Sequence, residues 1–457
     1  MRWVFTNGKY GWHSQFTAIK YRWSAWTARF RWQVLSTFGF QLFGLAIGTL
    51  QAVIVARWLG PSGKGILAIV LLIPGILSML LNAGINLAYV YFVGQRRFAL
   101  RMFTRHATTF TALGTLLGGV AIAVMHQYDI LTQWLPGLSL PFVLFGIALL
   151  PVYLLQGYLS AILQGQQRIV VLNIVHSFVL SVLLGGVIGL VVVLPMGVWG
   201  VLLAVAISQI VHLTILIRLI QRSGGQFKPM WNWQFIRAAL GFGLQGHVGN
   251  VFQFFNYRLD MFLVNYFLHP SAVGLYTVAT RMAELLWYLP NAVSFVIFPR
   301  ASTTSPGIMN QLTPRVFAIT SGITLVGAIT LGAIGSWLIR WLFSEAFADA
   351  YKPMLWLLPG VVLLGAAKVL TNEIAGRGFP IYNSIGAAVA LVLTVLLDLW
   401  WIPRHGIQGA AAASSVAYAA VFCCAIGFFF HVRRRTHHRD VKQPKTTSCI
   451  EHESLAG

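Results

Sequence analysis

The stretch Trp58-Leu59-Gly60-Pro61-Ser62-Gly63-Lys64-Gly65 has a second copy in the chain, Phe267-Leu268-His269-Pro270-Ser271-Ala272-Val273-Gly274. In each copy an apolar segment ends, Pro-Ser follows, a glycine comes four residues after the proline, and a new apolar segment begins. The copies lie 209 residues apart, and so do two shorter anchors, Gly197-Val198-Trp199-Gly200 and Gly406-Ile407-Gln408-Gly409. A weaker pair, Asn173 and Asn383, has a spacing of 210 residues. Several anchors at one spacing predict two similar halves, which is how many transporters are built.

The composition is that of an integral membrane protein. Hydrophobic residues make up 57% of the 457 residues and charged residues only 9%, whereas about a quarter charged is usual in soluble domains. Apolar segments of roughly 20 residues without period-two alternation predict membrane-spanning helices.

The net charge of +22 raises the question of a nucleic-acid partner. Basic loops that face an anionic lipid leaflet explain this charge better in a membrane protein, so we expect no nucleic-acid partner. Of three cysteines, Cys423 and Cys424 are adjacent in an apolar segment, which predicts neither a disulfide framework nor a metal site. The chain also has no Gly-Lys-Ser/Thr loop for a nucleotide, and we expect no cofactor.

Twelve apolar spans divide the chain as six plus six. We place them at about 36–56, 66–93, 107–125, 140–163, 171–194, 198–217, 239–266, 272–298, 315–342, 353–372, 381–401 and 408–431. An even number of spans per half gives the two copies the same orientation, so the repeat is parallel. The predicted fold class is therefore an all-α membrane protein built from two parallel six-helix repeats. Its parts are a basic tail at 1–33, bundles at 34–217 and 239–432, a connector at 218–238, and a basic tail at 433–457.

The positions of Lys and Arg predict the orientation. With both termini in the cytoplasm, the outer loops hold only five of the 32 basic residues, namely Arg57, Lys64, Arg340, Lys352 and Arg404. The tails, the connector and the inner loops hold nearly all the others, as the positive-inside rule requires. The sequence thus predicts a multi-pass protein of the cell membrane with cytoplasmic termini, a cytoplasmic connector and a basic, Trp-rich first segment that lies among lipid headgroups.

Charged residues inside the predicted spans are the candidate functional groups. A charge at mid-bilayer costs roughly 2.5–3.5 kcal/mol even on the lenient insertion scale, so these side chains are expected to avoid lipid. The cations are Arg258, Arg281 and Lys368, and the acids available for ion coupling are Asp260, Glu284 and Glu373. Arg281 and Glu284 are three residues apart, so a structural ion pair within one helix is an equally good interpretation of these two.

Polar uncharged residues add further candidates. The span at 239–266 is the most polar, and helical spacing puts His247, Asn250 and Arg258 on one side, where they could line a cavity. Asn82 and Asn86 also share one face, either toward a cavity or as contacts between helices. We interpret Asn173, His176 and His212 as packing residues and Asp398, beside two tryptophans, as interfacial.

Several of these segments resemble a known family. They are Ala56-Arg57-Trp58-Leu59-Gly60-Pro61-Ser62-Gly63-Lys64-Gly65 with the later Asn82-Ala83-Gly84-Ile85-Asn86, then Arg258-Leu259-Asp260, Val273-Gly274-Leu275-Tyr276, Arg281-Met282-Ala283-Glu284-Leu285-Leu286 and Phe298-Pro299-Arg300. Together they resemble the polysaccharide-transporter flippases of the multidrug/oligosaccharidyl-lipid/polysaccharide exporter superfamily. The likeness covers about 35–432, and it gives no chemistry to Pro61, Gly65, Pro270 or Gly274.

The resemblance implies a fold and a function. It implies two six-helix bundles in a V around a central cavity, and movement of an isoprenoid-diphosphate-linked oligosaccharide from the inner to the outer leaflet during cell-surface polysaccharide synthesis. It also implies membrane lipids, and a polysaccharide polymerase or chain-length machinery, as partners. A cationic lumen would suit the diphosphate, with Arg258 as the first candidate and Arg281 and Lys368 behind it.

Two other classes stay open at this point. A cation-coupled drug antiporter of the same superfamily would share the twelve-span plan, although many of these carry an acid in the first span and this chain has none there. A membrane-embedded glycosyltransferase or ligase would need an acidic catalytic motif or a large outer loop, and the predicted outer loops are short.

The predicted orientation can be measured directly. A reporter enzyme that is active only outside the cytoplasm, fused after residue 432, is expected to give no signal, because the basic flanking segments hold this end inside. The same reporter fused in the loop at 344–350 should be active. Strong activity at residue 432 would contradict the span count.

Overall fold

The computed structural model describes residues 11–442, with side chains described for 39–434 apart from positions 299, 303 and 306. The predicted basic tails therefore lie partly outside the described residues, at 1–10 and 443–457. Within the described range the chain is helical and contains no strand. Nine helices in this range are long and apolar enough to cross a membrane. The predicted all-α membrane fold is confirmed, and the count of twelve spans stays a prediction.

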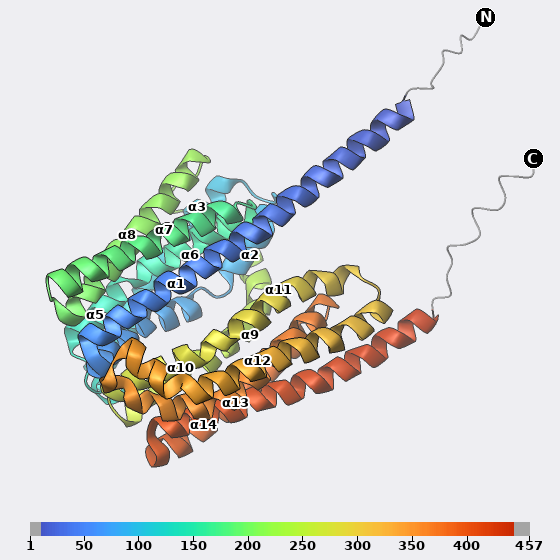
Figure 1. The fold of residues 1–457 in the computed structure, drawn as a ribbon. Helices are drawn as coiled ribbons and strands as arrows, with labels where there is room; N and C mark the ends of the chain where they lie inside the picture. The colour runs from blue at the N-terminus through green and yellow to red at the C-terminus, as the bar shows by residue number, and fades with distance from the viewer. Residues whose placement is uncertain (1–10, 443–457) are drawn as a thin grey trace, which may run out of the picture.

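The first bundle comprises the first eight α-helices and one short π-helical turn. They are α1 (Gly11–Leu81), α2 (Ile85–Gly94), α3 (Leu100–Gln127), α4 (Ile130–Trp134), α5 (Leu140–Ala148), α6 (Leu150–Gly165), α7 (Ile169–Val187), η1 (Ile188–Val193) and α8 (Gly197–Arg222). This bundle is blue to green in Figure 1.

The second bundle comprises the remaining six α-helices and two 3₁₀ turns. They are α9 (Trp233–Phe267), α10 (Pro270–Glu284), η2 (Leu285–Trp287), α11 (Tyr288–Thr303), α12 (Pro306–Phe343), η3 (Glu345–Ala350), α13 (Tyr351–Gly376) and α14 (Ile381–Lys442). Figure 1 shows the two bundles meeting near α5 and α10 and diverging toward the end where α1 begins and α14 ends.

The internal repeat is visible in the backbone. Gly60 breaks α1 with φ 64° and ψ −175°, and Gly406 breaks α14 with φ 59° and ψ −143°. Gly197, the repeat partner of Gly406 in sequence, has φ 58°. Glycine takes this left-handed conformation at no steric cost, whereas other residues rarely do. The equivalent anchors Gly197 and Gly406 thus share a positive φ, as the 209-residue spacing predicts, whereas His269, the counterpart of Gly60, has an extended φ of −169°.

The connector between the bundles is tied to the first one. Between α8 and α9 the chain runs along α3, where the Thr104 hydroxyl donates to the Gln226 carbonyl at 2.6 Å and accepts from the Gln226 amide at 3.0 Å. Thr109 makes the same pair of bonds to Met230, at 2.9 and 3.1 Å. Phe235, at the start of α9, then packs edge-on against Phe103 at 5.3 Å between ring centroids.

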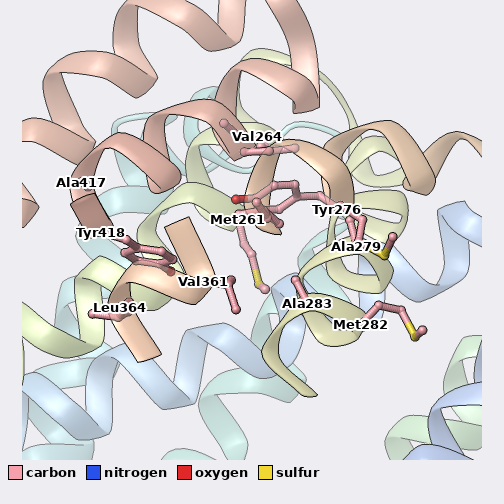
Figure 2. Close-up of a cluster of buried hydrophobic side chains, with 14 of the residues drawn as sticks. Met261, Val264, Tyr276, Ala279, Met282, Ala283, Val361, Leu364, Ala417 and Tyr418 are labelled. Carbon is pink, nitrogen blue, oxygen red and sulfur yellow. The ribbon is translucent and has the colours of Figure 1, made fainter. Parts of the chain in front are cut away.

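The second bundle has the larger apolar core. Figure 2 shows Met261 of α9, Tyr276 and Ala283 of α10, Val361 of α13 and Tyr418 of α14 converging in it. Tyr276 and Ala283 are fully buried. This core holds α9 and α10 in place, and these two helices carry four of the six charged residues predicted as functional; Lys368 and Glu373 are on α13.

The two copies of the repeated motif pack against each other at the end where the bundles meet. A Cβ added to Gly65 would lie 1.6 Å from the carbonyl oxygen of Pro270, and one added to Gly274 would lie 1.9 Å from that of Pro61. Only glycine lets two backbones approach so closely. We call Pro61, Gly65, Pro270 and Gly274 the Gly–Pro clasp. It joins α1 to α10 in a reciprocal contact, which is what a parallel repeat permits.

A side chain reinforces this closed end. Arg57 lies in α1, just before the break at Gly60. Its Nε donates to the Leu342 carbonyl at 2.8 Å, and its Nη2 donates to the Trp341 carbonyl. These carbonyls belong to the last turn of α12, where the helix dipole favours a cation. Arg57 therefore connects the first bundle to the second beside the Gly–Pro clasp.

The clasp predicts how single methyl groups act on stability. Gly65→Ala and Gly274→Ala should each lower the melting temperature of the detergent-purified protein, because overpacking of this kind costs about 1–3 kcal/mol. Gly322→Ala is the control, since nothing lies within 4 Å of its Cβ position in α12, and alanine is the better helix former. An unchanged melting temperature for Gly65→Ala would contradict the clasp.

Candidate substrate cavity

A cavity of about 1220 Å³ lies between the two bundles. The first bundle contributes one face of α1 and part of α7, and the second contributes α9, α10, α11 and the end of α12. Its charged lining residues are Lys64, Arg258, Arg281 and Glu284, and its polar lining includes Gln41, Gln51, Asn173, His176 and Asn291. Three cations and one acid give the lining a net positive charge.

The one acid in the cavity is paired with Arg258. The distance from Arg258 Nη1 to Glu284 Oε1 is 3.5 Å, and the two side chains are 35% and 21% exposed. Glu284 therefore joins α9 to α10 through Arg258, rather than Arg281 within α10 as the spacing of three residues also allowed. Arg258, the first candidate for binding an anion, already has an anion beside it.

The other two predicted cations have no acid within 4 Å among the described side chains. Arg281 projects from α10 toward α1, where its Nη2 lies 3.5 Å from the Cβ position of Gly48. Lys368 donates to Asn291 Oδ1 at 2.9 Å and stands 4.1 Å from the ring centroid of Trp287. Lys368 thus reaches the cavity through Asn291, which is one of its lining residues.

Four predicted polar residues do not line this cavity. His247 is buried against the backbone of Met79 and Leu80, so it packs between α9 and the end of α1. Asn250 is exposed elsewhere on α9. The structure therefore does not bring His247, Asn250 and Arg258 together.

Asn82 and Asn86 make contacts within and between helices. The Asn82 side chain accepts a hydrogen bond from the backbone amide of Asn86 at 3.2 Å, where α1 ends and α2 begins. The side-chain Nδ2 of Asn86 packs on Gly157 of α6, 3.1 Å from the place that an added Cβ would take. Neither side chain is among those that line the cavity, and a role in substrate binding stays a prediction.

Asp260 faces the interior of the second bundle. Its carboxylate accepts from the Tyr276 hydroxyl at 2.5 Å, the Ser414 hydroxyl at 3.3 Å and the Met261 amide at 2.7 Å. One turn earlier, Asn256 Oδ1 accepts from Thr394 at 3.2 Å. Because α9 and this part of α14 run side by side, the next turn places Asp398 toward Asp260.

Asp398 corrects one expectation from the sequence. It is 0% exposed rather than interfacial, and neither of its carboxylate oxygens has a hydrogen-bond partner among the described residues. The neighbouring Trp400 is 56% exposed. Asp398 and Trp400 lie on different sides of α14, so Asp398 is buried although its neighbour in sequence is exposed. Adjacency to tryptophan therefore does not place a residue at the interface.

Glu373 is fully buried in an ion pair at the far end of α13. Its Oε1 accepts from Arg377 Nε at 2.5 Å, and Arg377 Nη2 also donates to Asn310 of α12 at 2.9 Å. Thr313 donates to the same carboxylate oxygen at 3.5 Å. This arrangement neutralises Glu373 and fastens α12 to α13.

Sequence reasoning missed part of the cavity. Lys64 was expected in an outer loop and Asn173 and His176 in packing contacts, yet all three line the cavity. Lys64 sits inside the repeated motif itself, and the second copy has Val273 at the corresponding position. That difference between the copies was the available signal, since shared residues maintain the fold and unshared ones are free for function.

A family model described as polysaccharide biosynthesis protein matches residues 54–352. The chain belongs to this family. The match covers most of the first bundle, the connector and the first four α-helices of the second bundle, including every charged residue that lines the cavity.

Two transporters are similar to this chain in sequence. A Shigella flexneri protein assigned as an O-antigen transporter is 23% identical over 406 residues, which are 82% of this chain and 92% of the relative. A Haloferax volcanii protein assigned as a low-salt glycan biosynthesis flippase is 24% identical over 202 residues, 40% of each chain. The family and these relatives indicate a membrane transporter rather than an enzyme.

Solved structures share the fold. The lipid II flippase MurJ in an inward closed conformation aligns with a TM-score of 0.68 at 15% identity, covering 89% of this chain and 90% of that one. An inward-facing multidrug resistance MATE transporter of the MOP superfamily aligns with a TM-score of 0.65 at 16% identity, covering 88% and 99%. The two-bundle transporter fold expected from the sequence is thereby confirmed.

The pairing of Glu284 can be decided by charge exchange. In a double-mutant cycle on melting temperature, Arg258→Glu with Glu284→Arg should recover part of what either single change loses, a coupling of a few tenths to about 1 kcal/mol for so exposed a pair. The matched control is Arg281→Glu with Glu284→Arg, for which no recovery is expected. The reverse ranking would show that Glu284 belongs to Arg281.

Proposed function

We propose that this protein is a flippase that moves an isoprenoid-diphosphate-linked oligosaccharide from the inner to the outer leaflet during cell-surface polysaccharide biosynthesis. The observation that carries the proposal is the cavity of about 1220 Å³ between the bundles, with its excess of cations. A diphosphate is anionic and must leave the aqueous headgroup layer to cross the bilayer, so cations along its path lower the cost of transfer.

The cavity lining suits each part of such a substrate. Leu45, Leu67, Leu71 and Phe295 offer apolar surface for the isoprenoid end. Amide side chains such as Gln51 and Asn291 offer donors and acceptors for sugar hydroxyls. Arg281 and Lys64 offer positive charge for the diphosphate.

Transport by alternating access would use the bundles as two bodies. In this structure they are joined at the Gly–Pro clasp and diverge from it (Figure 1). With the predicted cytoplasmic termini, the clasp lies at the outer surface, so the cavity is reached from the inside. Opening of the clasp would expose the cavity to the outer leaflet of the cell membrane, where a polymerase and chain-length machinery would receive the product.

Ion coupling is proposed for Asp260, the acid of the three candidates that is not paired with an arginine. Glu284 is paired with Arg258 and Glu373 with Arg377. Asp260 is 2% exposed and lies toward Asp398 in the core of the second bundle. Two buried carboxyl groups are costly as a pair of anions, so a bound cation or proton would stabilise them.

The alternative is a cation-coupled antiporter for drugs or other small molecules. The MATE transporter fold supports it, since those structures share the two-bundle plan. The charge of the cavity favours the flippase, because organic cations would be repelled by Lys64, Arg258 and Arg281 around one acid.

Reconstitution tests the proposal. Vesicles that contain the purified protein and a fluorescent polyisoprenyl-diphosphate oligosaccharide should move the lipid between leaflets at least tenfold faster than protein-free vesicles, as measured by lectin capture or chemical quenching. Asp260→Asn should transport without responding to an imposed pH or sodium gradient. A rate equal to that of protein-free vesicles, together with uptake of cationic dyes, would favour the antiporter.

A further inference from the structure

The first part of α1 extends beyond the two bundles. The helix begins at Gly11, whereas the first predicted span begins at about residue 36. Figure 1 shows this part of α1 projecting past both bundles at the end where they diverge. We call residues 11–35 the α1 extension. At 1.5 Å per residue it is about 37 Å long.

Large apolar residues recur along the α1 extension at alternating spacings of four and three. We call them the apolar stripe, and they are Trp12, Phe16, Ile19, Trp23, Trp26 and Phe30. With 3.6 residues per turn, these six positions fall within about 80° of one another around the helix axis. The α1 extension is therefore amphipathic, with one narrow stripe about 27 Å long.

Four cations border the apolar stripe. Lys20 and Arg31 occupy positions about a quarter turn to one side of it. Arg22 and Arg29 occupy positions about a quarter turn to the other side. The α1 extension contains no acid, and the first acid of the chain is Asp129. Apart from Tyr21 and Trp32, the side opposite the stripe holds small residues, namely Ser14, Thr17, Ala18, Ser24, Ala25 and Ala28.

A second copy of the α1 extension is a poor partner for the apolar stripe. Spacings of four and three suit a coiled coil, but there the positions beside the seam face the other helix. Lys20, Arg22 and Arg29 would then face cations, and the α1 extension has no acid to pair with them. The end of α14 fits no better, because residues 433–442 hold five cations and one acid. The charge pattern instead suits a surface that is itself anionic.

We propose that the α1 extension is a docking surface for an anionic lipid leaflet. The apolar stripe lies at the boundary between headgroups and acyl chains, where tryptophan is favoured, and the bordering cations reach the lipid phosphates. With the predicted cytoplasmic termini, the α1 extension emerges at the inner leaflet. This inference does not depend on which substrate the protein transports.

Docking requires a bend between the α1 extension and the first span. In this structure α1 continues without a break through this junction (Figure 1). Ser36 and Gly39 lie there, and nothing comes within 4 Å of a Cβ added to Gly39. Sharp helix kinks occur at glycine and serine, and the open space around Gly39 lets the helix turn without a clash. The bend is therefore expected at residues 36–39.

Docking would also anchor one wall of the cavity. Directly after the junction, Phe40, Gln41 and Gly44 of the same helix line the cavity. Further along α1, Gly65 belongs to the Gly–Pro clasp. The first span is then held by lipid at its inner end and by the clasp at its outer end, so the α1 extension fixes the position of α1 at the mouth of the cavity.

Lipid-bound quenchers test the docking. Full-length protein carrying Cys423→Ser, Cys424→Ser and Cys449→Ser is labelled with a fluorophore at one introduced cysteine and placed as a single copy in nanodiscs of phosphatidylglycerol. Quenchers on the acyl chains should act about threefold or more strongly on a label at Phe16→Cys, in the stripe, than on one at Ser14→Cys, on the opposite side.

Charge variants test the choice of an anionic leaflet. Changing the four bordering cations to glutamine should lower quenching at position 16 by about threefold or more, and so should nanodiscs of neutral phosphatidylcholine. The matched control changes four exposed cations of the inner loops and connector to glutamine, and should leave this quenching within about twofold. These control positions are Arg96, Arg101, Arg218 and Arg222.

Three results would overturn the proposal. They are equal quenching at positions 14 and 16, quenching at position 16 that is unchanged in the glutamine variant, and shielding of position 16 from a water-soluble quencher only when two copies share a nanodisc. The last result would assign the apolar stripe to a second copy. If Phe16→Cys does not fold, Ile19→Cys places the label in the same stripe and should give the same result.

Discussion

The backbone contact between Gly65 and Pro270, with its mirror between Gly274 and Pro61, is the constraint on which the architecture depends. Side chains at these glycines would push α1 and α10 apart, because the Cβ positions fall within 2 Å of a carbonyl oxygen. With hydrogen atoms there instead, the bundles touch at one end and must diverge at the other (Figure 1). The cavity is the space that this divergence leaves, so two small residues far apart in sequence determine where a substrate could sit.

The buried acids of the second bundle differ in how their charge is compensated. Glu373 acquires a cation from Arg377 and Asp260 shares hydrogen bonds with Tyr276 and Ser414, whereas Asp398 has no hydrogen-bond partner among the described residues. Through these contacts, Glu373 and Asp260 hold helices together within one bundle. Lys64, Arg258 and Arg281 face the space between the bundles, where water or an anionic ligand can reach them. The chain has a net charge of +22. The positive charge of the cavity follows from which side chains line it, and not from this overall charge alone.

The structure changes the ranking of the candidate residues. Arg258 was preferred because it lies in the most polar span, but its partner Glu284 comes from the next helix, and the distance between helices is not visible in a helical periodicity. Lys64 was placed outside the membrane because it follows Gly-Pro-Ser-Gly, a pattern typical of a loop. The loop is so short that α1 resumes at once, and the break at Gly60 turns the lysine inward.

The amino-acid sequence by itself determined the class of this protein, because a chain with 57% hydrophobic and 9% charged residues belongs in a bilayer, and its long apolar segments lack the period-two alternation of a barrel. It also determined the duplication, since the 209-residue spacing of the motifs needs no coordinates. Tertiary structure alone decided which of the charged residues meet. Ion pairs between helices, the burial of Asp398 and the positions of Lys64 and Arg281 in the cavity lining depend on helix rotation and on the angle between bundles. Packing across the whole molecule sets both quantities, and local sequence does not encode them.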